Sequence, residues 1–244
     1  MNEPVRNKGI YLLPNLFTIA AIFAGFYAIV AAMKGQFDVA AMAIFIAMIA
    51  DGLDGRVARL TNTESAFGAQ LDSLSDMIAF GVAPALVAYS WCLSSLGKIG
   101  WLAAFFYTAA TALRLARFNI QSDDPRYFTG FPSTSAAGLI AGMIWFANVN
   151  DLIGRTWSVV VLVITVLTAV LMVSNVRYYS FKHFDLRGKV PFVMVLSVVI
   201  VYMLVMLDPG HILFIFFLLF ALSGFVTNYF YHKKQGDGEG ESPL

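Results

Sequence analysis

Apolar runs of about 20 residues recur along almost the whole chain, and no other feature constrains its fold as strongly. A helix of this length crosses the hydrocarbon core of a bilayer. Backbone polar groups must be paired inside that core, and a helix pairs them within one segment. We therefore predict an all-α integral membrane protein, a bundle of about eight transmembrane helices, at about residues 11–33, 36–60, 64–94, 98–120, 132–149, 156–176, 189–207 and 211–231.

The composition agrees with this class of protein. Of the 244 residues, 59% are hydrophobic and 13% are charged, whereas soluble domains carry roughly one-quarter charged residues. No small-residue cleavage site follows the polar residues 1–9, so we expect the first span to be retained. The single cysteine, Cys92, excludes an internal disulfide and a thiolate zinc site. We expect one membrane domain over residues 1–232 and a disordered polar tail over 233–244.

The basic residues predict the orientation of the bundle. With the N-terminus inside, 13 of the 16 Lys and Arg residues fall on the inner side, and only Lys34, Lys98 and Arg155 fall outside. Basic loops stay in the cytoplasm. We therefore expect a multi-pass protein of the cell (inner) membrane with both termini cytoplasmic. The two longer loops, 121–133 and 178–191, lie on the same side.

Four aspartates lie close together at the predicted cytoplasmic rim of the second and third spans: Asp51, Asp54, Asp72 and Asp76. The first two are three positions apart and the last two are four apart, so each pair lies on one face of its helix. A tight turn between the helices would bring the two faces together. Ionisable groups at membrane depth are costly and usually functional, and four carboxylates need a cation to offset their repulsion.

The chemistry of this group indicates a metal site. Carboxylate oxygens without His or Cys suit hard cations such as Mg²⁺, Mn²⁺ or Ca²⁺. Four carboxylates could hold two ions about 3.5–4 Å apart, an arrangement that stabilises phosphoryl-transfer transition states. Thr61 and Glu64 have the spacing of a capping box for the third helix. We therefore predict a polar cavity, open to the cytoplasmic side, that holds two divalent ions.

Small and basic residues around the aspartates indicate a phosphate ligand. Gly55, Ala58 and Gly68 lie on or beside the carboxylate faces, where a missing side chain leaves room for a base or a phosphate. Arg59 can pair with phosphate oxygens. Ser65 could bind phosphate through its hydroxyl and the helix N-terminus. Together these residues predict a site for a metal-bound diphosphate.

Residues 51–76 follow the pattern D-x2-D-G-x2-A-R-x8-G-x3-D-x3-D, which resembles the signature of the CDP-alcohol phosphotransferases. Members of that family are integral-membrane enzymes that move a substituted phosphoryl group from a CDP-linked donor to an alcohol and release CMP. The resemblance implies that the four aspartates bind two divalent metals, Mg²⁺ or Mn²⁺, and that Asp76 is also the general base. It implies that the glycines, the alanine and Arg59 hold the CDP group, with Ser65 as a further contact.

Three further blocks are similar to the members of this family that make phosphatidylserine: "YLLPNLFT" at 11–18, "RLARFN" at 114–119 and "YFTGFPS" at 127–133. The similarity implies that CDP-diacylglycerol and L-serine give phosphatidylserine and CMP, with Asp76 taking the proton of the serine hydroxyl. That subgroup commonly reads G-L-P-x-P where this chain has "GFPST" at 130–134. The family also implies a homodimer.

The acceptor site is expected near the end of the fourth span. A zwitterionic acceptor needs a cation for its carboxylate, and Arg114 and Arg117 lie there together with Asn119, which can donate or accept hydrogen bonds. Anchoring of the arginines to lipid headgroups is the alternative, and the resemblance of "RLARFN" favours a substrate role. Asn15 and Thr18 could reach the cytidine or a phosphate, or make hydrogen bonds within the bundle.

Other functions are compatible with parts of this pattern. Another acceptor, such as glycerol 3-phosphate, inositol phosphate or choline, is the nearest alternative. Membrane prenyltransferases also use aspartate-rich sites, but their two acidic motifs are far apart in the chain. A divalent-cation transporter would place acidic residues near the middle of the membrane or on both sides, whereas these four lie at one rim. The expected partners are the two substrates and membrane lipids, and we expect no nucleic-acid partner.

Overall fold

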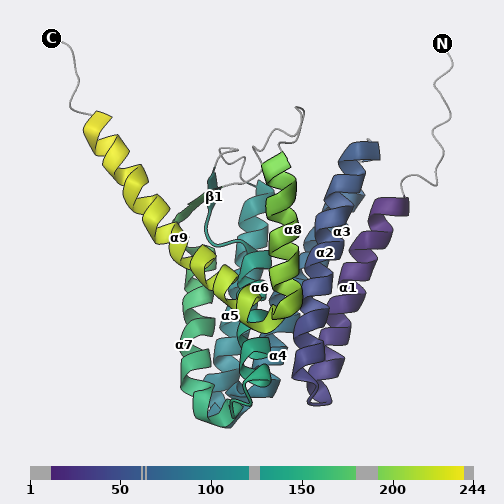
Figure 1. Cartoon of the computed structure of the whole chain (residues 1–244), viewed down its shortest axis with the longest axis vertical. Helices are drawn as coiled ribbons and strands as arrows, with labels where there is room; N and C mark the ends of the chain where they lie inside the picture. Colours follow the sequence, from purple (N-terminus) through teal and green to yellow (C-terminus); the bar gives the residue numbers. More distant parts are fainter. Residues whose placement is uncertain (1–11, 62, 64, 121–126, 180–191, 239–244) are drawn as a thin grey trace.

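The computed structural model describes residues 12–61, 63, 65–120, 127–179 and 192–238, and it is a helical bundle with one small sheet (Figure 1). The helices follow the predicted spans closely. Their bounds are α1 Leu12–Met33, α2 Phe37–Thr61, α3 Ala66–Asp76, the π-helix η2 Met77–Val82, α4 Ala83–Trp91, the 3₁₀-helix η3 Leu93–Leu96, α5 Lys98–Ile120, α6 Ser133–Val149, α7 Gly154–Val173, α8 Phe192–Leu207 and α9 Pro209–Gly238.

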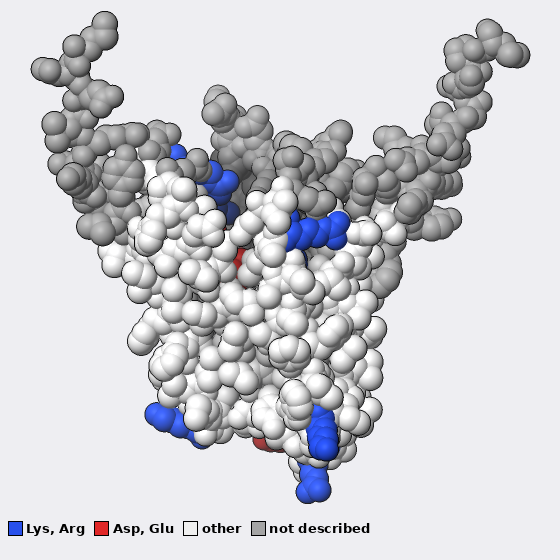
Figure 2. Space-filling view, turned by 180° about the vertical axis from the view of Figure 1, so that it is seen from behind, with Lys and Arg blue, Asp and Glu red and all other residues white. Residues whose placement is uncertain are grey.

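Within the described residues, four helical stretches are long and apolar enough to cross a membrane: residues 14–33, 66–91, 98–120 and 154–173. The second stretch joins α3, η2 and α4 into one continuous helix. Large apolar side chains such as Phe23, Phe105 and Val159 are exposed on the outside of the bundle. On the face in Figure 2, Lys and Arg lie at the two ends, with a broad uncharged band between them. These features are those of a multi-pass membrane protein.

Alanine dominates the packing of α1 against α2. Ala21, Ala28, Ala40 and Ala47 are completely buried, and such small side chains let two helices approach closely. The turn between these helices contains Gly35, whose φ of +73° favours glycine. The helix α1 therefore packs closely along α2, and it also contacts α3, at one edge of the bundle (Figure 1).

The turn between α2 and α3 differs from its predicted form. Thr61 is the last residue of α2, and its hydroxyl donates to Val57 O at 2.7 Å. It therefore cannot begin the next helix, and the predicted capping box from Thr61 is wrong. Ser65 is the N-cap of α3 instead, and its Oγ accepts a hydrogen bond from Gly68 N at 3.0 Å.

Two short strands lie within segments that were predicted as loops. β1 (Tyr127–Thr129) pairs antiparallel with β2 (Arg177–Tyr179). Gly130 follows β1 with φ of +82°, and a Cβ there would collide with the backbone of Met172. At the other end of the chain, α9 continues to Gly238, whereas the sequence predicted a disordered tail from residue 233.

Candidate active site

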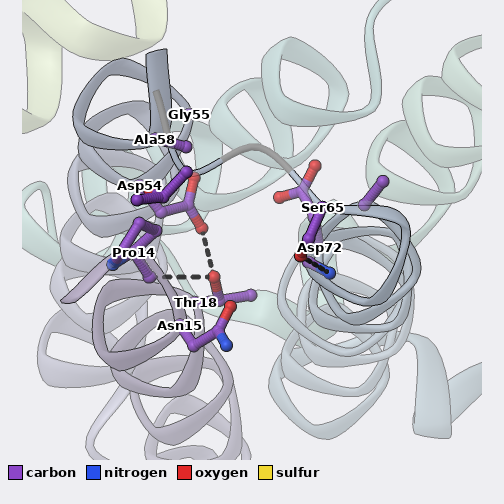
Figure 3. A pocket seen from close by; sticks show the side chains of 11 residues that line it. Pro14, Asn15, Thr18, Asp54, Gly55, Ala58, Ser65 and Asp72 are labelled. Carbon is purple, nitrogen blue, oxygen red and sulfur yellow. Dashed lines mark hydrogen bonds between the residues drawn. The ribbon is translucent and has the colours of Figure 1, made fainter. Parts of the chain in front are cut away.

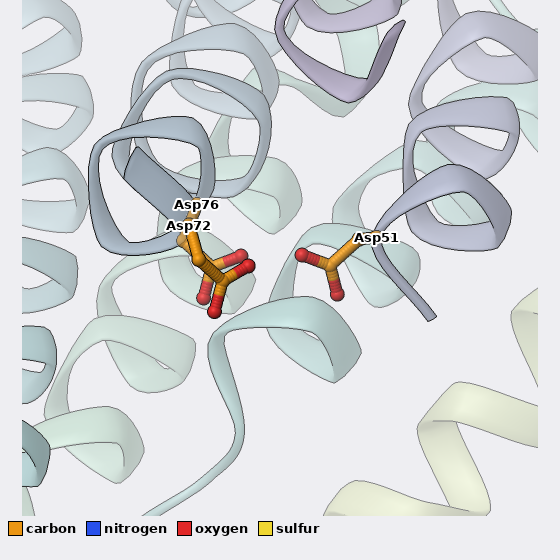
Figure 4. Close-up of side chains that lie close together, drawn as sticks. All are labelled: Asp51, Asp72 and Asp76. Carbon is orange, nitrogen blue, oxygen red and sulfur yellow. The ribbon is translucent and has the colours of Figure 1, made fainter. Parts of the chain in front are cut away.

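Three aspartates from two helices form a compact group, here called the aspartate cluster: Asp51, Asp72 and Asp76. Asp51 lies in the second half of α2, and Asp72 and Asp76 lie one turn apart on α3 and point toward Asp51 (Figure 4). One oxygen from each carboxylate lies within 4.8 Å of an oxygen from each of the other two. The predicted antiparallel turn therefore does bring carboxylates of both helices together.

The cluster has the chemistry of a divalent-cation site. Around Mg²⁺, ligand oxygens lie about 2.0–2.1 Å from the ion, so opposite ligands are about 4.2 Å apart. The oxygens of the cluster all lie within 4.8 Å of one another, a limit that includes this separation, so the three carboxylates can converge on one ion. Oδ1 of Asp76 is buried and has no hydrogen-bond partner among the described residues. An oxygen-only ligand set with an unsatisfied buried oxygen suits Mg²⁺ or Mn²⁺.

Asp54 faces a neighbouring pocket rather than the cluster. It is three positions after Asp51, so the two side chains point about 60° apart around the helix axis. Asp54 is 5% exposed, and Thr18 of α1 donates from Oγ1 to its Oδ2 at 2.7 Å (Figure 3). Asp72 borders both the cluster and the pocket. The four aspartates thus form two adjoining sites that share Asp72.

The pocket lies between the ends of α1, α2 and α3 and has a volume of about 350 Å³. This size is within the range of small-molecule sites. Its walls are formed mainly by small and polar residues. The lining residues are Pro14, Asn15, Thr18, Asp54, Gly55, Ala58, Thr63, Ser65, Gly68, Ala69 and Asp72 (Figure 3). We call this space the donor pocket.

Two glycines give the donor pocket its shape. A Cβ added at Gly55 would meet only Arg59, at 4.0 Å, so the missing side chain opens the wall. A Cβ at Gly68 would lie 3.2 Å from Ser65 Oγ and 3.7 Å from Asn15 Oδ1. Arg59 is exposed and is not among the lining residues, because its Nε donates back to Gly55 O at 2.9 Å. Its Nη2 lies 4.0 Å from the Cβ position of Gly55, so the guanidinium lies at the edge of the pocket.

The three residues predicted for the acceptor have different surroundings. Arg114 donates from Nη1 to Ser133 Oγ at 2.9 Å, and its Nε is buried with no hydrogen-bond partner among the described residues. Its charge attracts that of Asp76, although the described residues contain no direct ion pair between them. Arg117 and Asn119 lie farther along α5. Arg114 thus interacts electrostatically with one member of the aspartate cluster, Asp76.

Comparison with known proteins identifies the family of the chain. Residues 11–171 match the CDP-alcohol phosphatidyltransferase family, a range that includes all four motif aspartates. The chain belongs to this family. It is 42% identical over 219 residues to the CDP-diacylglycerol–serine O-phosphatidyltransferase of Helicobacter pylori, covering 89% of this chain and 91% of that protein. The protein of the same name from Bacillus subtilis is 34% identical, over 70% of this chain and 91% of that protein. The one from Methanocaldococcus jannaschii is 38% identical, over 57% of this chain and 63% of that protein.

For this member of the CDP-alcohol phosphatidyltransferase family, some residues near the site were not singled out from the sequence. Ser133 at the start of α6 holds Arg114. Ser73 receives a hydrogen bond from Asn119 Nδ2 at 3.1 Å. Asn175 accepts one from Arg117 Nη2 at 2.9 Å. Ser73 lies between the motif residues Asp72 and Asp76, and Ser133 is the last residue of the block "YFTGFPS". Their positions in the sequence alone could therefore have indicated that both serines lie near the site.

Proposed function

We propose that the chain transfers the phosphatidyl group of CDP-diacylglycerol to L-serine and releases CMP. The observation that carries this proposal is the shared position of Asp72, which borders both the aspartate cluster and the donor pocket. A diphosphate in the pocket would then lie beside a metal held by the cluster. The relatives from three organisms, all named for the serine reaction, support the choice of acceptor.

The donor pocket is assigned to the CDP end of the lipid substrate. Its glycine and alanine walls allow a flat base or a phosphate to approach the backbone. Ser65 and the N-terminus of α3 present hydrogen-bond donors and a positive dipole end to an anion. Asn15 and Thr18 supply polar groups from α1. Arg59 is assigned to phosphate oxygens, because its Nη1 and Nη2 groups can donate to an anion beside Gly55 while Nε remains bonded to Gly55 O.

Asp51, Asp54, Asp72 and Asp76 are assigned as ligands of two divalent ions, Mg²⁺ or Mn²⁺. Bound metal would neutralise the diphosphate and the charge that builds on the departing CMP. Three of these residues already lie within ligand spacing of one another. Asp54 lies on the opposite wall of the adjoining pocket, where its carboxylate can complete the second position.

Asp76 is assigned as the general base for the acceptor. It takes the proton of the serine hydroxyl, and the oxygen forms a bond to the phosphorus that carries the diacylglycerol. The bond from that phosphorus to the oxygen of CMP breaks, so no covalent enzyme intermediate is required. Arg114 is assigned to the serine carboxylate, because its Nε has no partner among the described residues and its charge faces Asp76.

This arrangement favours serine over the other acceptors. A phosphorylated acceptor such as glycerol 3-phosphate would need further cations beside Arg114. The other two residues predicted for the acceptor site make hydrogen bonds within the protein: Arg117 to Asn175, and Asn119 to Ser73. These bonds use one donor of each side chain, so both residues keep further groups for a substrate and remain candidates beside Arg114.

The membrane arrangement completes the proposal. We assign about eight membrane spans to the chain and place it in the inner membrane. Both termini and the site are assigned to the cytoplasmic side, because basic residues predominate on that side of the bundle. The chain forms one membrane domain over residues 1–232 with a polar tail after it. A homodimer is proposed from the family alone.

Purified protein with CDP-diacylglycerol and radiolabelled serine tests the proposal. We expect radiolabelled phosphatidylserine and an equal amount of CMP. CMP release with glycerol 3-phosphate but not with serine would refute the choice of acceptor. We expect Asp76→Asn, which removes the base and keeps the size of the side chain, to abolish turnover while the protein remains folded. Normal turnover of that variant would remove Asp76 from the base role.

A further inference from the structure

A π-helical turn begins immediately after the proposed base. The helix from residue 66 to 91 changes from α to π geometry at Met77, one residue after Asp76, and returns to α at Ala83. Within it, Ala83 N donates to Ile78 O, five residues back, which is the π pattern. Single π turns inside α-helices occur frequently at functional sites.

The π turn changes the direction of Asp76 relative to the rest of the helix. In an uninterrupted α-helix, Asp76, Phe80, Ala83 and Val87 would lie on one face, since they are spaced by three or four residues. Phe80, Ala83 and Val87 are completely buried in the apolar core. One extra residue in the turn rotates the C-terminal part of the helix by about 100°. The apolar face can therefore pack in the core while Asp76 faces Asp51.

Proline creates a need for an outside hydrogen bond at this turn. Pro84 has no N–H, so it cannot donate to Phe80 O four residues back, as a helical residue normally would. Tyr107 of α5 supplies the missing donor: its Oη donates to Phe80 O at 3.1 Å. Tyr107 is completely buried. A buried carbonyl without a partner would cost about 1–3 kcal/mol.

The same face of α5 reaches from this turn to the aspartate cluster. Tyr107, Thr111 and Arg114 are spaced by four and three residues, so they lie along one side of α5. Thr111 fills the space left by Gly81, where an added Cβ would lie 3.2 Å from its Cγ2. One helix face thus holds the π turn and also presents Arg114 near Asp76.

We propose that Tyr107 is a positioning residue of the reaction: by donating to Phe80 O, it maintains the π turn that directs Asp76 toward Asp51 in the aspartate cluster. This inference rests on the proposed role of Asp76. Tyr107 does not touch a substrate, and its effect passes through the backbone of the helix that carries Asp72 and Asp76.

Tyr107→Phe removes the hydroxyl and keeps the ring. Positional errors of about 1 Å can lower rates about 100-fold, so at saturating metal we expect kcat to fall by roughly 10- to 100-fold with both KM values within about twofold. Direct Mn²⁺ binding, followed by electron paramagnetic resonance without substrate, should weaken in the same variant. The matched control is Tyr178→Phe, since Tyr178 is also completely buried and donates to a carbonyl, Ala221 O, at 3.2 Å.

A double variant separates positioning from stability. Adding Pro84→Ala to Tyr107→Phe restores an N–H for Phe80 O and allows the turn to become α-helical. We expect the Tm to recover and kcat and Mn²⁺ affinity to remain low. Recovery of kcat in the double variant, or a Tyr107→Phe enzyme that matches the Tyr178→Phe control, overturns the inference. Wild-type protein that makes no phosphatidylserine overturns the proposed function instead, so the two failures are distinct.

Discussion

The hydrogen bond between Thr18 and Asp54 gives a measurable prediction about the donor pocket. Thr18 is 4% exposed and Asp54 is 5% exposed, so water does not replace the bond easily. Thr18 Oγ1 lies 2.7 Å from Asp54 Oδ2 and 3.2 Å from Pro14 O, and its single hydrogen serves the shorter contact. The bond links α1 to Asp54 on the wall of the pocket.

Replacing Thr18 by valine removes this donor and keeps the volume and the β-branched shape. Hydrogen bonds to charged groups contribute about 1.5–3 kcal/mol, which corresponds to roughly a 10- to 150-fold change in an equilibrium constant. Because Asp54 would no longer be held against α1, we expect Thr18→Val to weaken binding of Mn²⁺–CDP by about this factor. The kcat/KM for CDP-diacylglycerol should fall in parallel.

Isothermal titration of detergent-solubilised protein with CDP in the presence of Mn²⁺ measures the affinity. The matched control is Thr168→Val on α7, where a threonine with 1% exposure donates to Ile164 O at 2.7 Å, within its own helix. The control should bind CDP like the wild type. A Thr18→Val protein whose affinity stays within about twofold of the control would show that this bond does not organise the pocket.

Three further predictions concern the metal, the helix packing and the turn before α9. Removal of divalent ions by chelation should abolish turnover, and Mg²⁺ or Mn²⁺ but not Zn²⁺ should restore it, because the aspartate cluster offers only oxygen ligands; full activity after chelation would contradict the metal site. Gly25→Ala should reduce the free energy of unfolding by about 1–3 kcal/mol and so lower the Tm, because its Cβ would lie 2.7 Å from Ala79 Cα. Gly52→Ala should leave the Tm unchanged, because its Cβ would meet no atom within 4 Å. Hydrogen bonds from the His211 side chain and backbone lower the pKa of the partly exposed Asp208. Their stabilisation should therefore be present above the ordinary carboxyl pKa and disappear as the pH falls through the lowered value. The Tm of Asp208→Asn should differ from that of the wild type at neutral pH and converge with it in acid.

Much of the site could be predicted from helical spacing alone. The three- and four-residue intervals of the motif place two carboxylates on one face of each helix, and the structure brings Asp51, Asp72 and Asp76 together. The hydrogen bond that holds Asp54 at the adjoining pocket comes from Thr18 of α1, which is 36 positions away in sequence. Spacing within one helix carries no information about such a partner.

The bounds of the helices were also predictable, but their internal geometry was not. Hydropathy treats residues 64–94 as one apolar run, and the structure indeed has a continuous helix there. The π turn at 77–82 depends on a proline that removes one donor and on a tyrosine from another helix that supplies it. Pro84 marked the place in the sequence, but nothing local to it indicated that Tyr107 would supply the bond.

The hydrogen bond from Tyr107 to Phe80 also has a consequence for biogenesis. Synthesis proceeds from the N-terminus, so Phe80 and Pro84 leave the ribosome before Tyr107 does. Until α5 is made, the carbonyl of Phe80 has neither its usual helical donor nor its tyrosine, and an unpaired carbonyl in lipid costs several kcal/mol. We therefore expect stable insertion of the helix that carries Asp72 and Asp76 to depend on α5, so that the two segments leave the translocon as a pair.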